Sequence, residues 1–196
     1  ATVQSDDSLT QFITNYYPSA LHNTTGTYQK RARIKETTAG IVVEKRWRYL
    51  HVGSCIFHQQ WSLPFRNEET SFTHQSNHVG SVYYHFIHGK IMLYGEVALQ
   101  KFAHMAIVQG AHWQPANDLH LNIAMRYLPP DYFNIYANPL SESSQARNEW
   151  GVLTKITYNF PNYYALQMYW DLFRLPTTSF SSLKPYTGYE MAVQVS

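Results

Sequence analysis

The chain has 196 residues, and its 15 Lys and Arg against 13 Asp and Glu leave a net charge of only +2. This near balance excludes the strong positive field expected of a nucleic-acid-binding surface. Aromatic residues make up 16% of the chain, which excludes intrinsic disorder, and a single cysteine, Cys55, excludes a disulfide framework.

In chain order, residues 1–35 are predicted to form an N-terminal loop, and residues 36–196 show nine blocks in which apolar and polar residues alternate with period two. Such alternation predicts β-strands, and no block has a sustained helical stripe or an apolar run long enough for a membrane-spanning helix. The predicted fold is therefore all-β. Its strands cover residues 36–46, 48–60, 77–87, 90–100, 103–113, 119–128, 150–160, 163–173 and 187–195.

The connections alternate in length. Those near residues 46–47, 88–89, 115–118 and 161–162 are tight, whereas 61–76, 129–148 and 174–186 are long, and only the turn near 100–102 breaks the rule. Short turns at one end and long loops at the other predict an antiparallel up-and-down meander. Outer-membrane barrels share this asymmetry, so the expectation is a transmembrane β-barrel or part of one.

Three features favour a membrane barrel over a soluble one. The strands are long enough to cross a bilayer when tilted. Aromatic side chains at strand ends on the apolar face predict a girdle at headgroup level, formed by Trp113, Tyr127, Trp150, Phe160 and Tyr164. An Arg or Lys facing lipid at the midplane costs roughly 2–4 kcal/mol, and the charges fall opposite the aliphatic stripe. They predict a charge ladder across a wet lumen: Glu96, Arg126, Glu149, Lys155, Asp171 and Glu190.

Nine is an odd number of strands, whereas bacterial single-chain barrels normally have an even number. Either residues 1–35 contain a further strand, with 9–17 and 25–34 as candidates, or the chain is a portion of a longer barrel. The end of the chain at Val193-Gln194-Val195-Ser196, in mid-alternation, favours the second expectation.

Several segments together resemble the barrel region of Gram-negative outer-membrane helix-hairpin-helix proteins, a competence-type DNA-binding family. They are TTGTYQKRARIKETTAG at 24–40, GEVAL at 95–99, YANPLSESSQARNEWG at 136–151, DLFRLP at 171–176 and GYEMAVQV at 188–195. The sharpest are Asn148 to Gly151 and Asp171 to Pro176; Thr177 stands where the family often has Trp. The helix-hairpin-helix residues themselves have no counterpart in this sequence. The resemblance therefore implies an outer-membrane location and a barrel architecture rather than an activity.

The sequence does not predict catalysis, a metal or a cofactor. His74 and His78 have a spacing that forms a metal site on a helix, but they fall in a loop and strand, and His85 and His88 straddle a turn. Cys55 lies in a predicted strand without a basic neighbour, which is typical of a packed residue rather than a nucleophile.

Ser141 to Ser144 lack the strand-to-helix elbow of a nucleophilic serine. The loop 129–148 that contains them is either a polar outer loop or one that folds inward and narrows the barrel. The basic run 30–35 is interpreted as a solvated strand edge, with contact to lipopolysaccharide phosphate or nucleic acid as the alternatives.

The predicted function is a non-enzymatic outer-membrane barrel portion with a role in passage, anchoring or assembly. Its expected partners are the lipid bilayer, lipopolysaccharide and other outer-membrane or periplasmic proteins, and not nucleic acid. The alternatives are a soluble β-barrel or sandwich that binds an apolar ligand, and a DNA-uptake component whose binding weakens steeply with salt.

Overall fold

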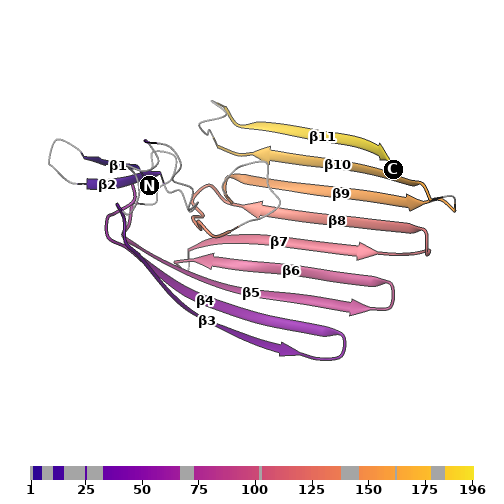
Figure 1. Ribbon diagram of the computed structural model, residues 1–196, viewed down its shortest axis with the longest axis horizontal. Helices are drawn as coiled ribbons and strands as arrows, with labels where there is room; N and C mark the ends of the chain where they lie inside the picture. Colours follow the sequence, from indigo (N-terminus) through magenta and orange to yellow (C-terminus); the bar gives the residue numbers. More distant parts are fainter. Residues whose placement is uncertain are drawn as a thin grey trace. The chain divides into compact units, whose positions relative to one another are not determined.

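The computed structural model describes residues 2–5, 11–15, 25, 33–66, 73–101, 103–137, 146–161, 163–177 and 184–196, which are almost entirely β-strands (Figure 1). Within these ranges, no helix is long and apolar enough to cross a membrane. The strands are β1 (Thr2–Ser5), β2 (Gln11–Asn15), β3 (Glu36–Arg46), β4 (Leu50–Trp61), β5 (Ser76–His88), β6 (Ile91–Gln100), β7 (His104–Trp113), β8 (Leu119–Leu128), β9 (Glu149–Asn159), β10 (Ala165–Leu175) and β11 (Tyr186–Val195).

Strands β3 to β11 form one nine-stranded sheet in which every strand lies beside its neighbours in the chain. The predicted all-β, antiparallel, up-and-down architecture is confirmed, and the strand count agrees with the nine blocks of alternation. The sheet is open, with β3 and β11 at its two edges, so the described strands form part of a barrel wall at most. A two-residue turn at Gly89 and Lys90 joins β5 to β6, and Gly89 adopts the left-handed φ of 58° that such turns need.

The chain divides into two compact units, one of residues 1–41 and 57–78 and the other of residues 42–56 and 79–196. In the first unit, β1 and β2 pair as a separate hairpin. Ile13 of β2 is fully buried; its N–H donates to the Pro64 carbonyl at 2.8 Å, and its own carbonyl accepts from the Arg66 N–H at 3.0 Å. The strand sought within 9–17 is therefore present, but it pairs with β1 and does not join the nine-stranded sheet. Most of the other candidate, 25–34, lies outside the described residues.

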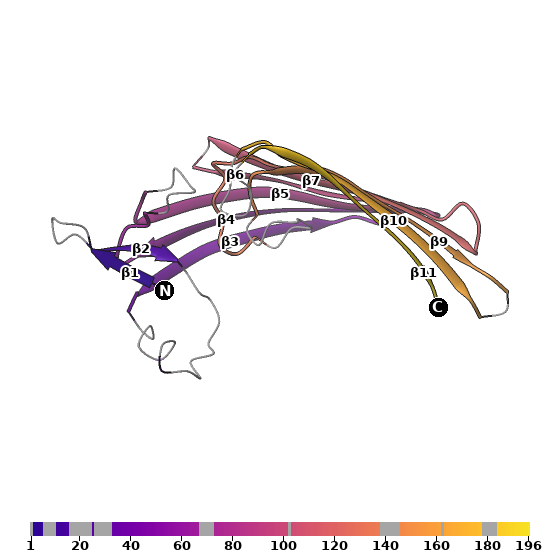
Figure 2. The same cartoon turned by 90° about the horizontal axis from the view of Figure 1, so that it is seen from above.

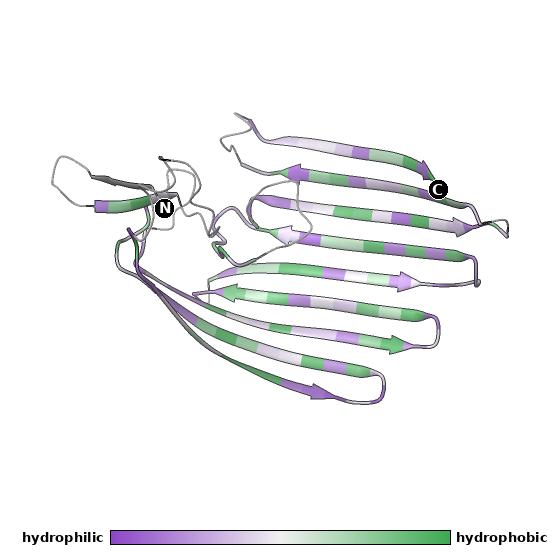
Figure 3. Cartoon of the chain, viewed as in Figure 1, coloured by the Kyte–Doolittle hydropathy of each residue, from purple (hydrophilic) through white to green (hydrophobic). Residues whose placement is uncertain are grey.

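In the second unit, the register of β6 to β11 shows which side chains share a face of the sheet. Directly paired residues of antiparallel strands project to the same side, so Tyr127 shares a face with Trp150, and Arg126 with Gly151. Figure 3 shows the resulting alternation of apolar and polar residues along these strands. One side, the apolar face, carries from β8 to β11 Leu119, Leu121, Ile123, Met125, Tyr127, Trp150, Val152, Ile156, Tyr158, Leu166, Met168, Trp170, Leu172, Tyr189, Met191, Val193 and Val195. The other side, the polar face, carries Glu96, Gln100, Arg126, Glu149, Lys155, Asp171 and Glu190.

The burial of these two faces is the reverse of that in a soluble sheet. On the apolar face, Ile123 is 43% exposed and Leu172 is 57% exposed. On the polar face, Arg126, Glu149 and Asp171 are all buried. A water-soluble sheet buries its apolar side in a core, whereas here the second unit leaves that side uncovered.

Glycines on the polar face let large side chains of a neighbouring strand lie flat on the sheet. Tyr94 of β6 is paired with Gly110 of β7, and a Cβ at residue 110 would lie 2.1 Å from the Tyr94 Cζ. Phe173 of β10 covers Gly188 of β11 in the same way, with a Cβ-to-Cζ distance of 2.5 Å. These aromatic rings occupy the space of the missing side chains and tie consecutive strands together. Strands β9, β10 and β11 are also visibly bowed along their length (Figure 2).

We expect Gly110→Ala to lower the free energy of unfolding by about 1–3 kcal/mol, because the new methyl group displaces the Tyr94 ring. The matched control is Gly80→Ala, where a Cβ would meet its nearest neighbour, the Ile56 Cγ1, at an ordinary 3.7 Å. Equilibrium denaturation of both variants measures the difference. In a Tyr94→Ala background the cost of Gly110→Ala should largely vanish; an unchanged cost there would show that the ring is not its cause.

Candidate functional site

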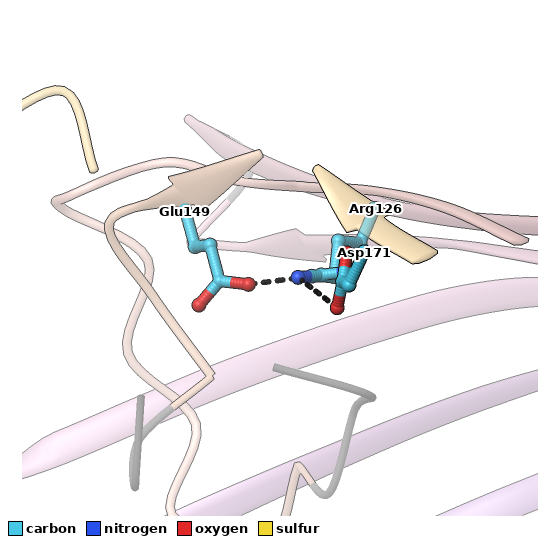
Figure 4. A network of polar contacts seen from close by, with 3 residues as sticks. All are labelled: Arg126, Glu149 and Asp171. Carbon is cyan, nitrogen blue, oxygen red and sulfur yellow. Dashed lines mark hydrogen bonds and ion pairs between the residues drawn. The ribbon is translucent and has the colours of Figure 1, made fainter. Parts of the chain in front are cut away.

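Three charged side chains from three consecutive strands form a buried ion cluster on the polar face (Figure 4). Arg126 of β8 donates from Nε to Glu149 Oε1 at 2.5 Å. Its two terminal nitrogens donate to the two carboxylate oxygens of Asp171 in β10, both at 2.9 Å. The side chains of Arg126, Glu149 and Asp171 are 3%, 0% and 10% exposed. Two parallel bonds to one carboxylate are the geometry for which a guanidinium is best suited.

Arg126 can reach Asp171 because the strand between them has a glycine at the crossing point. Gly151 of β9 is paired directly with Arg126, and a Cβ there would lie 2.7 Å from the guanidinium carbon. The same Cβ would also lie 2.9 Å from the Leu172 backbone carbonyl, which cannot swing away as a side chain can. Gly151 is therefore a structural requirement of the cluster rather than a neutral position.

The cluster contains three of the six charges predicted to form a ladder. The remaining three lie on the same face. Glu190 is the cross-strand neighbour of Asp171, whereas Lys155 is paired with Asn122 and Tyr169, and Glu96 with Tyr83 and Val108. The polar face thus concentrates charge at one buried point near the long-loop ends of β8 to β10 instead of spreading it evenly.

The segment that follows β8 folds back onto the polar face. Tyr132 is 2% exposed and packs with Ala98 of β6, Ala106 of β7 and Leu128 of β8. The next residue, Phe133, donates its N–H to the side-chain oxygen of Gln100 at 2.9 Å. Burial raises the pKa of the Tyr132 hydroxyl. Of the two alternatives for the loop 129–148, residues 129–137 therefore follow the one in which the loop folds over the sheet.

Asn148 fixes the return of this loop to β9. It adopts a left-handed φ of 56°, which Asn tolerates better than most residues. Its side chain makes three hydrogen bonds to Thr177. The Nδ2 donates to the Thr177 carbonyl at 3.0 Å, and the Oδ1 accepts from the Thr177 N–H at 3.0 Å and from its hydroxyl at 2.6 Å. Its N–H donates to the Pro129 carbonyl at 3.3 Å. Asn148 therefore joins the loop between β8 and β9 to the start of the loop between β10 and β11.

The five girdle residues lie at the two ends of the strands. Tyr127 and Trp150 form a cross-strand pair at the long-loop end. Trp113 ends β7 at the short-turn end, and Phe160 and Tyr164 flank the turn between β9 and β10 there. The Phe160 ring meets that of Tyr158 edge-to-face, with centroids 4.8 Å apart. All five are at least 44% exposed.

The apolar face also carries polar residues, among them Thr154 of β9, Arg174 of β10 and Thr187 of β11. Gln109 of β7 falls on this face, opposite Gly95 of β6 and Met125 of β8. Its Nε2 donates to the hydroxyl of Tyr84 and to the backbone carbonyl of Tyr94, the latter at 3.1 Å. Both side chains approach Gly95, whose lack of a Cβ gives them room.

The other candidates from the sequence are distributed as follows. Within the described ranges no three His, Cys, Asp or Glu side chains gather to hold a metal. Cys55 is a free, half-buried thiol in β4, and Ser141 to Ser144 lie outside the described residues. Of the basic run, Lys35 is held at the end of β4, where its N–H donates to the Ser62 hydroxyl at 3.1 Å.

No protein-family model matches the chain, and no curated protein matches it. The resemblance to the helix-hairpin-helix outer-membrane family therefore stays a prediction. The two segments that carry it most sharply nevertheless supply the contacts of this site: Asn148, Glu149 and Gly151 from the first, and Asp171 from the second.

We expect Arg126→Leu to lower the free energy of unfolding by about 3–5 kcal/mol, because it leaves two buried carboxylates without their cation. The control is Lys155→Leu, which removes a half-buried charge from the same face and should cost under about 1 kcal/mol. Denaturant titration of both variants distinguishes a structural ion cluster from a simple lining charge. Equal midpoints for the two variants would contradict a structural role for Arg126.

Proposed function

We propose that the nine-stranded sheet is part of the wall of a transmembrane β-barrel in an outer membrane, with its apolar face toward lipid and its polar face toward a water-filled lumen. The observation that carries the proposal is the inverted burial of the two faces. Large aliphatic and aromatic side chains such as Ile123, Trp150 and Leu172 are exposed, while Arg126 and its partners are buried on the other side. Hydrocarbon is the medium in which that arrangement is stable.

The spacing of the aromatic residues supports the same assignment. Trp150 and Phe160 bracket β9 ten residues apart, which corresponds to about 33 Å along an extended strand. At a tilt of about 45° this becomes roughly 23 Å of membrane depth, close to the ~25 Å apolar band of outer-membrane barrels. The resemblance of this chain to the Gram-negative outer-membrane family, based on other features of the sequence, points to the same location.

The infolded segment supports passage, rather than anchoring alone, as the role of the lumen. Residues 129–137 lie on the polar face and are held there by Tyr132 and by the Gln100 side chain. In a barrel, a loop folded onto the lumen side narrows the channel and selects solutes by size and polarity. We therefore propose a non-enzymatic barrel in which this segment forms the constriction.

A charge placed on the apolar face tests the membrane assignment. Ile123 pairs with Thr154, near the middle of the span between Trp150 and Phe160, so Ile123→Arg should destabilise folding into phosphatidylcholine vesicles by about 2–4 kcal/mol. Gln167→Arg, on the polar face of β10, is the control and should be nearly neutral. If the protein is instead a soluble barrel or sandwich, the unaltered chain stays monodisperse without detergent and Ile123→Arg inserts a charge into its ligand pocket.

Releasing residues 129–137 from the polar face tests whether this segment narrows the channel. The double variant Gln100→Ala/Tyr132→Ala removes two of the contacts that hold it on the polar face and should raise single-channel conductance in planar bilayers and make it fluctuate. Tyr136→Ala is the control, because Tyr136 belongs to the same segment but is 53% exposed. Equal conductance of all three proteins would exclude a constricting loop. A silent trace from all of them would favour an anchoring or assembly role.

A further inference from the structure

The first unit contains a pair of histidines that the site on the polar face does not use. His58 of β4 and His78 of β5 face each other with their Nδ1 atoms 3.2 Å apart. Their ring centroids are 4.4 Å apart, and the ring planes are inclined by 30°. Sequence spacing does not reveal this pair, because the two residues are twenty positions apart and meet only through the pairing of β4 with β5.

We propose that His58 and His78 form a binding site for a borderline divalent transition-metal ion such as Zn²⁺. The proposal does not rest on the membrane assignment: His78 is on the apolar face, but it lies four residues beyond Val82, which is in register with the girdle residue Tyr127, toward the long-loop end. Two imidazole nitrogens on a tetrahedral Zn²⁺, each at 2.0–2.1 Å, lie about 3.3 Å apart, which is close to the separation between the two Nδ1 atoms. Each ring then carries its proton on Nε2, so that both Nδ1 lone pairs are free to bind the ion.

The opposite side of the two strands holds the pair in register. Gln59 and Asn77 are each adjacent in sequence to one of the histidines, and both are fully buried. The Asn77 amide donates to the Gln59 side-chain oxygen at 3.4 Å, and the Gln59 amide donates in turn to a Glu36 carboxylate oxygen at 3.3 Å. Neighbouring residues of a strand point to opposite faces of the sheet. The buried chain of amides therefore lies on the face opposite the two imidazoles and fixes the strands that carry them. Such preorganisation lowers the entropic cost of binding an ion.

The surroundings suit a site of two protein ligands completed by water. His78 is exposed and His58 is only partly covered, so the remaining coordination positions are open to solvent. Imidazole is a ligand that Zn²⁺, Cu²⁺ and Ni²⁺ prefer, whereas Ca²⁺ and Mg²⁺ prefer oxygen ligands. The ion would clamp the end of β4 to the start of β5 beside the segment that joins them, where the Trp61 N–H donates to the Gln75 carbonyl.

Calorimetric titration of the whole chain with Zn²⁺ tests the proposal. The unaltered protein should bind one ion at this site, and His58→Gln and His78→Gln should each weaken that binding by roughly tenfold or more, because each removes half of the protein ligands. The matched control is His112→Gln: His112 also lies near a second ring, that of His120 at 5.6 Å, but its Nδ1 is bonded to Asn122 Oδ1 at 2.7 Å. This variant should bind Zn²⁺ as the unaltered protein does.

Two further readouts keep the test decisive if a variant folds poorly. Electron paramagnetic resonance of the unaltered protein loaded with one equivalent of Cu²⁺ should show two coordinated imidazole nitrogens. Zn²⁺ should also raise the midpoint of thermal unfolding of the unaltered and His112→Gln proteins, but not that of His78→Gln. Identical Zn²⁺ isotherms for all variants, or a single coordinated imidazole on Cu²⁺, would overturn the site.

Discussion

The guanidinium of Arg126 joins β8, β9 and β10 at one buried point of the polar face. It bonds Glu149 on one neighbour and crosses Gly151 to bond Asp171 on the next strand but one. Two carboxylates buried together repel each other, so the cation is a condition of their burial rather than an optional addition. The glycine is equally necessary, because any side chain at residue 151 would occupy the path of the guanidinium.

This arrangement, together with the small apolar cluster around Tyr132, defines the register of the strands on the polar face. A one-residue slip of β9 against β8 would place Trp150 under the guanidinium and move Glu149 to the opposite face. The glycine–aromatic pairs act in the same direction, because Tyr94 fits flat against the sheet only when Gly110 stands opposite. Register is thus specified by a few close contacts on the polar face, while the apolar face contributes a regular surface.

A feature could be predicted from the sequence when the residues that determine it lie close together in the chain. The alternation that marks a strand is such a feature: a period of two over ten residues, as in 119–128, identifies a strand and its two faces without knowledge of any partner strand. The ion cluster depends on pairing among three strands, so the sequence could place Arg126, Glu149 and Asp171 on one face but could not show that only these three meet. Tyr132 illustrates the limit best: it lies in an irregular segment and packs on Ala98, more than thirty residues earlier. The strand within 9–17 was also predictable, but its pairing with β1 instead of the large sheet was not.

Gln109 gives a second view of the proposed lipid contact, because it is a polar side chain on the apolar face. It is paired with Gly95 on one neighbouring strand and with Met125 on the other. On a surface that faces water, an amide can be hydrated and has no need of a protein partner. On a surface that faces hydrocarbon, each unpaired N–H costs several kcal/mol, roughly as much as the lipid contact of a large side chain contributes. The Gln109 amide nitrogen donates to the Tyr84 hydroxyl and the Tyr94 carbonyl, and Gly95 leaves the space in which these contacts form. The sheet thus satisfies the donors of this amide from within, using a tyrosine and a glycine on adjacent strands, which is the behaviour that a lipid-facing position requires.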